Sequence, residues 1–84
     1  MKVAVDISLY PLNEHYIEPI KDVIERLNGH DGIEVWTNAM STQLFGDYDD
    51  VMDALRQEIA ATFDSNPKAV FTIRILNNPA THPG

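Results

Sequence analysis

Hydrophobic and polar residues alternate at both ends of the chain, which is the pattern of strands with one buried face. Residues 2–10 place four aliphatic side chains on one face, namely Val3, Val5, Ile7 and Leu9. The other face carries Ala4, Asp6, Ser8 and Tyr10. Pro11 ends this strand, because proline has no N–H to donate. Residues 69–76 predict a second such strand, with Phe71, Ile73 and Ile75 opposite Val70, Thr72 and Arg74.

Two internal segments have the three- and four-residue apolar spacing of amphipathic helices. The first is expected from an N-cap at Asn13 to about Asn28, and Pro19 marks either a late start or an early kink. Its apolar stripe is Tyr16, Ile17, Ile20, Val23, Ile24 and Leu27. The second opens at Asp47, a cap in a variant capping box with Asp50, and stops at 65–67. Its stripe is Val51, Met52, Leu55, Ile59 and Phe63.

A small, polar stretch at 37–42 lies between the strand-like segments 33–36 and 43–46. The arrangement predicts a β-hairpin whose turn type is open. Polar side chains in such a turn have two common uses. They bond the turn's own backbone, or they form a shelf for a ligand. Both uses remain open from the sequence.

The order of elements is β-α-β-β-α-β, which predicts an α+β, ferredoxin-like domain over residues 1–76 and a flexible tail over 77–84. Its four-stranded antiparallel sheet has the order 4-1-3-2, with both helices on one face. Asp6 and Arg74 are then expected to pair across neighbouring strands. The opposite face also receives one parity of the hairpin, either 34, 36 and 38 or 41, 43 and 45. A face this aromatic favours a partner or a ligand.

The composition excludes several function classes. The net charge of −7 argues against nucleic acid and against an anionic membrane surface, and it suits a cationic ligand. The absence of cysteine excludes disulfides, zinc thiolates and thiol catalysis. No signal peptide or membrane span is evident, so a cytoplasmic location is expected. An 84-residue chain buries only about 60–65% of its surface, so self-association is expected.

The sequence predicts a small-molecule site rather than a catalytic centre. His15, His30 and His82 have no metal-ligand spacing, so exposed surface histidines and no metal site are expected. Aromatic side chains beside a few polar groups describe a ligand pocket. Asp6 and the aromatic Trp36 would suit a planar cationic heterocycle, through opposite charge and cation–π attraction.

These features resemble the YkoF-like family of thiamine-binding proteins. The resemblance lies in the motifs Ser8-Leu9-Tyr10-Pro11-Leu12, Asn38-Ala39-Met40-Ser41-Thr42 and Gly46-Asp47-Tyr48-Asp49, and covers about residues 2–76. It implies a ferredoxin-like fold, and a non-catalytic role in carrying or supplying thiamine or its hydroxymethylpyrimidine part, a ligand rather than a cofactor. It also implies a homodimer or homotetramer. The ligand-contacting residues that it implies are Ser8, Tyr10, Asn38, Met40, Ser41, Thr42 and Asp47. Asp6 and Trp36 are further candidates, because they are expected on the open face of the sheet.

Two alternatives stay open from the sequence. One is a small cofactor-free enzyme that uses Asp6, Tyr10 or His15 for acid–base chemistry. The other is a structural module whose open sheet face serves only self-assembly. The fold by itself does not decide among them, because ferredoxin-like domains carry many functions.

Overall fold

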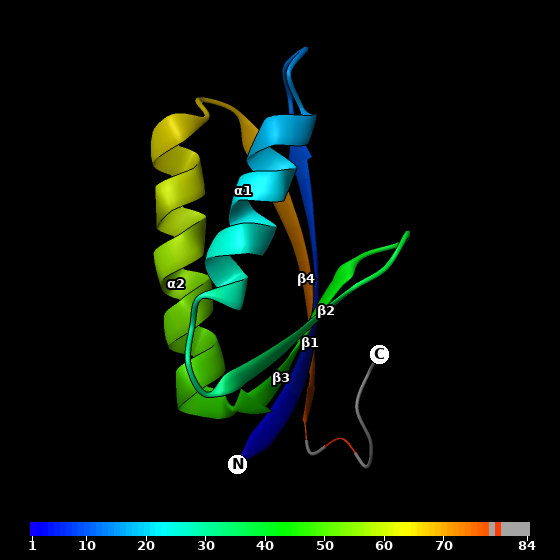
Figure 1. Cartoon of the computed structure of the whole chain (residues 1–84), viewed down its shortest axis with the longest axis vertical. Coiled ribbons are helices and arrows are strands. Elements are labelled where there is room, and N and C mark those ends of the chain that lie inside the picture. The colour runs from blue at the N-terminus through cyan, green and yellow to red at the C-terminus, as the bar shows by residue number, and fades with distance from the viewer. Residues whose placement is uncertain (78, 80–84) are drawn as a thin grey trace.

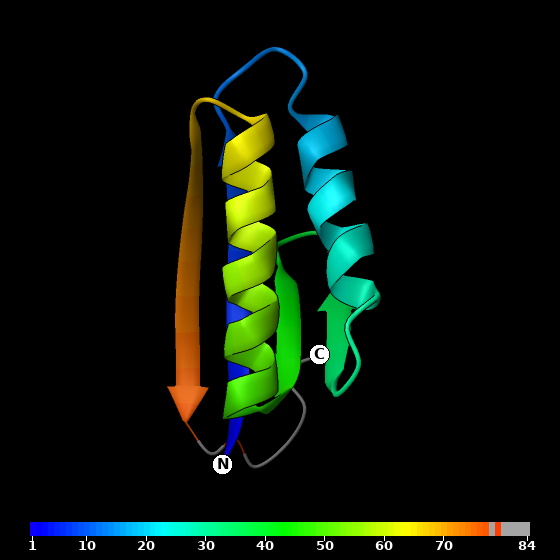
Figure 2. The same cartoon turned by 90° about the vertical axis from the view of Figure 1, so that its left-hand side faces the viewer.

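The computed structural model describes residues 1–77 and 79 and contains one sheet covered by two helices (Figure 1). The strands are β1 (Lys2–Pro11), β2 (Ile33–Thr37), β3 (Thr42–Asp47) and β4 (Ala69–Asn77). The helices are α1 (Ile17–Asn28) and α2 (Tyr48–Ser65). Both helices lie on the same side of the sheet and leave its other side open (Figures 1 and 2).

The sheet is antiparallel throughout, with the strand order β2-β3-β1-β4. This order is 4-1-3-2 read from the other edge, so the predicted ferredoxin-like topology is confirmed. The register pairs Asp6 with Gln43 on one side and with Arg74 on the other. Trp36 also pairs with Gln43. The two sets of hairpin residues considered as alternatives from the sequence therefore lie on the same face of the sheet, where Glu34 and Trp36 are opposite Phe45 and Gln43.

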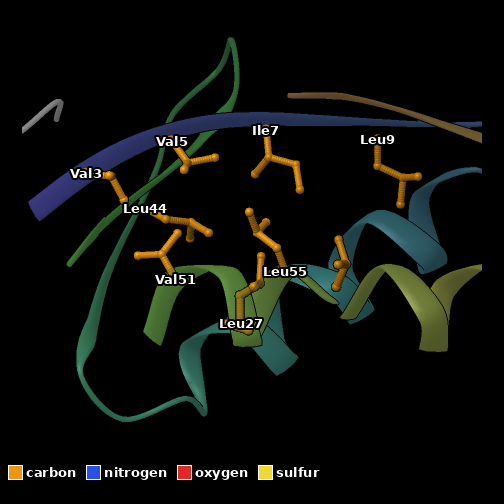
Figure 3. Close-up of a cluster of buried hydrophobic side chains, with 10 residues drawn as sticks. Val3, Val5, Ile7, Leu9, Leu27, Leu44, Val51 and Leu55 are labelled. Atoms are coloured by element: carbon orange, nitrogen blue, oxygen red, sulfur yellow. The ribbon is translucent and has the colours of Figure 1, made fainter. Parts of the chain in front are cut away.

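The core lies between the aliphatic face of β1 and the inner faces of the helices. Figure 3 shows Val3, Val5, Ile7 and Leu9 pointing from β1 towards the helices, where they meet Leu27, Leu44, Val51 and Leu55. Leu27, Leu44 and Val51 are at most 1% exposed. Burial of this apolar face is the main term that holds the helices to the sheet.

The helix boundaries correct two predictions. α1 begins at Ile17, with Tyr16 before it and no side-chain cap, so the N-cap predicted at Asn13 is wrong. A start near Asn13 would place Pro19 beyond the first turn, where it would remove a helix hydrogen bond. Asp47 does precede α2, but its side chain makes no capping bond. Its carboxylate instead lies 3.5 Å from Lys2 Nζ.

The inner face of α2 is rotated relative to the predicted stripe. Phe63 is 49% exposed, while Glu58 and Thr62 are buried. The Phe63 ring packs at the edge of the core, with its centroid 5.6 Å from that of Phe71. Within residues 1–77 and 79, no helix has the length and apolarity needed to cross a membrane. The predicted tail, 77–84, starts at the last residue of β4, and residues 78 and 80–84 lie outside the described residues.

Candidate functional site

A cavity of about 230 Å³ lies between α1, β1 and the tip of the β2–β3 hairpin. α1 continues past the point where β2 and β3 end (Figure 2), and the β1–β3 register stops at Ile7 and Thr42. The apolar side chains of the cavity come from β1, β4 and α1, and include Ile7, Leu9, Ile20, Ile24 and Phe71. The lining also contains most of the predicted ligand residues, namely Ser8, Tyr10, Asn38, Met40, Ser41 and Thr42.

The hairpin tip is held by the side chain of Asn38. Its Oδ1 accepts hydrogen bonds from the backbone N–H of Met40 at 2.8 Å and of Ser41 at 3.1 Å. The Asn38 N–H donates to the Ser41 carbonyl at 3.0 Å, which closes the turn. Of the two uses considered for this polar stretch, the structural one is therefore present at Asn38. The amide nitrogen of Asn38 donates to no residue in the described chain and is left for other contacts.

Two hydroxyls lie at the base of the hairpin tip. Thr37 Oγ1 and Thr42 Oγ1 are 3.3 Å apart, and both residues line the cavity. Thr42 is 7% exposed. A hydroxyl can donate once and accept twice, so this pair retains acceptor capacity towards the cavity.

Asp6 lies on the open face of the sheet, outside the cavity lining. Arg74 Nε donates to Asp6 Oδ2 at 2.9 Å, and Arg74 Nη2 donates to the same oxygen, so the predicted cross-strand pair is confirmed. The Ser41 hydroxyl and the Arg74 guanidinium beside Asp6 lower the pKa of that carboxyl below its usual value. The Gln43 Oε1 on this face is buried and has no hydrogen-bond partner among the described residues.

The structure does not bring Trp36 or Asp47 to the cavity. Trp36 is 44% exposed on the open face, and its Nε1 lies 3.4 Å from Glu34 Oε2. Asp47 pairs with Lys2 at the opposite end of β1, five register positions away from Thr42. The nine predicted residues therefore fall into three places: the cavity, the open face for Asp6 and Trp36, and the end of β3 for Asp47.

A second polar cluster, which the sequence did not predict, joins the two helices. Arg26 Nε donates to Glu58 Oε1 at 2.6 Å, and His30 Nε2 lies 2.6 Å from Glu58 Oε2. Arg26 Nη2 donates to Thr62 Oγ1 at 2.9 Å, and that hydroxyl donates to the Glu58 carbonyl at 2.8 Å. We call these four residues the interhelical network. His30 is thus partly buried and paired, and its prediction as an exposed surface histidine is wrong.

Burial and hydrogen bonding have opposite effects on Glu58. Burial by itself raises the pKa of the carboxyl, but the hydrogen bonds from His30 and Arg26 outweigh it and lower the pKa below the ordinary 4.5. Arg26 and Glu58 fall between the apolar positions of the two predicted stripes and look like solvated charges in the sequence. The available signal was the i, i+4 pair Glu58 and Thr62, which lies on the inner face of α2.

Comparison with known proteins gives a family and a set of similar structures. The family model of the YKOF-related family matches residues 2–81. A hypothetical protein from Methanocaldococcus jannascii is 26% identical, with a TM-score of 0.81 and coverage of 99% of this chain and 87% of that one. A protein from Streptococcus pneumoniae is 20% identical, with a TM-score of 0.87 and coverage of 95% and 90%.

A third similar structure, from Thermotoga maritima, is described as a "putative thiamine biosynthesis/salvage protein". It is 22% identical, with a TM-score of 0.79 and coverage of 89% of this chain and 82% of that one. No curated protein sequence matches the chain. The family match spans nearly all of the sequence and all six elements of the fold. The chain therefore belongs to the YKOF-related family.

Proposed function

We propose that this protein binds thiamine, or the hydroxymethylpyrimidine part of it, and supplies the vitamin without transforming it. The observation that carries the proposal is the cavity at the hairpin tip, which combines an apolar floor with several hydroxyl and amide groups. Such a combination is typical of small-molecule sites. Family membership and the description of the Thermotoga maritima structure support a thiamine-related role.

The size of the cavity favours one ring inside it. At about 230 Å³ it is smaller than the roughly 300–1,000 Å³ of pockets that enclose drug-sized ligands. A pyrimidine would therefore occupy the cavity, and the rest of thiamine would extend towards solvent. The cationic thiazolium would then face the surface of a protein with a net charge of −7.

The lining supports binding rather than catalysis. Tyr10 is its one titratable side chain among the described residues, and it is 55% exposed. Asp6 is on the other face of the sheet and His15 is outside the lining. General acid–base catalysis requires a titratable group within hydrogen-bond reach of the reacting proton, usually with a second group to orient it. We accordingly propose a protein without enzymatic activity.

The open face of the sheet supports self-association as a homodimer or homotetramer. Tyr10, Trp36, Val70 and Leu76 are between 44% and 59% exposed there. A second copy would cover this apolar surface. Size-exclusion chromatography with light scattering tests this: a dimer or tetramer mass supports it, and a monomer at micromolar concentration contradicts it.

Calorimetric titration with thiamine, and in parallel with the free pyrimidine alcohol, tests the binding proposal. We expect saturation at one ligand per chain. Thr42→Val should weaken binding by about tenfold, because it removes a buried hydroxyl that lines the cavity and leaves a ligand group without its partner. Asp53→Ala, an exposed change on the outer face of α2, is the matched control and should bind as the wild type does. Absence of saturable heat with either ligand would contradict the proposal.

A further inference from the structure

The backbone of β1 alternates between its two neighbouring strands. Opposite residues in an antiparallel pair exchange both N–H···O bonds at every second position. At the start of β1, the Tyr48 N–H donates to the Met1 carbonyl at 2.8 Å, so odd-numbered residues of β1 face β3. Beyond its end, the Leu12 N–H donates to the Lys68 carbonyl at 3.1 Å, so even-numbered residues face β4.

This alternation directs the peptide N–H and C=O of Leu9 towards the hairpin side of β1. The ladder to β3 ends at Ile7 and Thr42, one hydrogen-bonded pair earlier. Among residues 1–77 and 79, neither atom takes part in the hydrogen bonds of the turns, the loops or the hairpin tip, and the ladder to β3 does not reach Leu9. Leu9 nevertheless lines the cavity and is only 9% exposed as a residue. An unpaired donor and acceptor at the wall of a cavity are suited to a ligand group, since backbone polar groups in such surroundings are rarely left without a partner.

The hairpin tip explains why this pair is open. Continuing the β1–β3 register by two residues would place Met40 opposite Leu9. The Met40 N–H is instead bonded to Asn38 Oδ1, and the Met40 side chain is 87% exposed. Figure 1 shows the tip between β2 and β3 projecting away from the helices. The Asn38 turn thus withdraws the natural partner of Leu9 and keeps the edge of β1 free.

We propose that the unpaired peptide edge of Leu9 is the recognition element of the cavity, and that it selects heterocycles in which a ring nitrogen lies next to an amino group. The Leu9 N–H would donate to the ring nitrogen and the amino group would donate to the Leu9 carbonyl. This inference rests on the proposed function, since 4-aminopyrimidines such as the pyrimidine half of thiamine carry this edge.

The chemistry of the edge gives its selectivity. Within one residue of an extended strand, N–H and C=O lie side by side and point the same way, as a donor beside an acceptor. An N=C–NH₂ edge is complementary to both, while the apolar side chains of Ile20, Ile24 and Phe71 pack against the ring. Loss of the amino group leaves the Leu9 carbonyl without a donor inside the cavity, a loss worth about tenfold or more in affinity.

A pair of ligands separates this inference from the proposed function. The probes are 4-amino-5-hydroxymethyl-2-methylpyrimidine and its analogue without the 4-amino group, each titrated calorimetrically into the wild-type protein. We expect the amino compound to bind at least about tenfold tighter. Equal affinity overturns the role of Leu9 but leaves the binding function intact. Failure of both pyrimidines and of thiamine to bind overturns the proposed function itself.

Amide-to-ester replacement tests the residue directly, because an 84-residue chain is accessible to chemical synthesis. An ester at Leu9 replaces its N–H by oxygen and should weaken the amino compound by about tenfold, with little loss of stability. The matched control is an ester at Val5, whose N–H is used in the ladder to β3 and which does not line the cavity. It should lower stability and retain the ligand preference. Ligand affinity that is insensitive to the ester at Leu9 overturns the inference.

Discussion

The interhelical network and the hairpin cavity both hold polar groups in partly buried surroundings, but only the first satisfies them internally. Both carboxylate oxygens of Glu58 have a partner at 2.6 Å: Arg26 for Oε1 and His30 for Oε2. In the cavity, the Leu9 peptide and the Asn38 amide nitrogen have no partner within the described part of the chain. The difference teaches that burial alone does not mark a ligand site. Unmet hydrogen-bonding capacity beside a hollow does.

The largest expected effect is a loss of folding stability when the interhelical network is broken. Glu58→Ala removes the partner of two cationic or polar groups and should lower the free energy of unfolding by about 2–3 kcal/mol. This is less than the ~3–5 kcal/mol of a fully buried pair, because the Arg26 side chain is 38% exposed. Urea denaturation measures the change. Asp53→Ala, which breaks only the exposed Asp53–Arg56 pair, is the control and should cost at most about 0.5 kcal/mol.

Changes in the interhelical network should lower stability but leave thiamine affinity unchanged. A stably folded Glu58→Ala protein should bind thiamine with wild-type affinity. A large loss of affinity in that variant, at a temperature where it is folded, would show that the two regions are not separate.

Filling the cavity should weaken binding more than it weakens the fold. Ile24→Phe adds a ring to a side chain that lines the cavity, and should reduce thiamine affinity at least about tenfold, or ~1.4 kcal/mol. Calorimetry measures the affinity, and thermal denaturation checks that the variant is folded. Ile59→Phe is the matched control, since Ile59 packs against the core from α2 but does not line the cavity. Equal effects of the two substitutions would contradict the location of the site.

Acid should weaken the contribution of Glu58. Its pKa in the folded protein lies below the ordinary 4.5, because the hydrogen bonds from His30 and Arg26 outweigh burial. The contribution of ionised Glu58 to the free energy of unfolding is therefore fully present above pH 4.5. It is lost as the pH falls through the pKa that Glu58 has in the folded protein. We expect the stability difference between the wild type and Glu58→Gln to narrow between pH 6 and pH 3. A difference that is constant across this range would contradict the assignment.

The smallest effect is expected at the exposed Asp6–Arg74 pair. The Arg74 side chain is 80% exposed, so Arg74→Ala should change the stability of the isolated subunit by less than about 1 kcal/mol. Chemical denaturation at low protein concentration measures this value. A loss comparable to that of Glu58→Ala would mean that Asp6 is held more tightly than its exposure indicates.

The sequence predicted the fold well because each strand and helix has a clear apolar period. Alternation in β1 and β4, and the order of the six elements, were sufficient for the topology. The motif at Asn38–Thr42 also led to the cavity. The hairpin register and the early end of the β1–β3 ladder were not predictable, because they depend on how Asn38 bonds the backbone of its own turn.

The remaining errors have a common physical cause. Glu58 and Thr62 replace Phe63 on the inner face of α2, because Arg26 from α1 and His30 from the loop that follows α1 satisfy the buried carboxylate. A rule that assigns charged residues to solvent does not detect such a match, which forms only when the two helices pack. The register of β3 places Trp36 on the open face and Asp47 at the far end of the strand, away from the cavity. Motif residues by themselves carry no information about this register.

Residue-resolved amide hydrogen exchange in the ligand-free protein tests the central contrast most directly. Ile7, Leu9 and Tyr10 lie within four positions on one strand, and only Leu9 lacks a strand partner for its N–H. We predict that the Leu9 amide exchanges at least about tenfold faster than those of Ile7 and Tyr10, and that thiamine slows it. Protection of Leu9 equal to that of Ile7 in the free protein would contradict the account, because the edge of β1 would then already be paired.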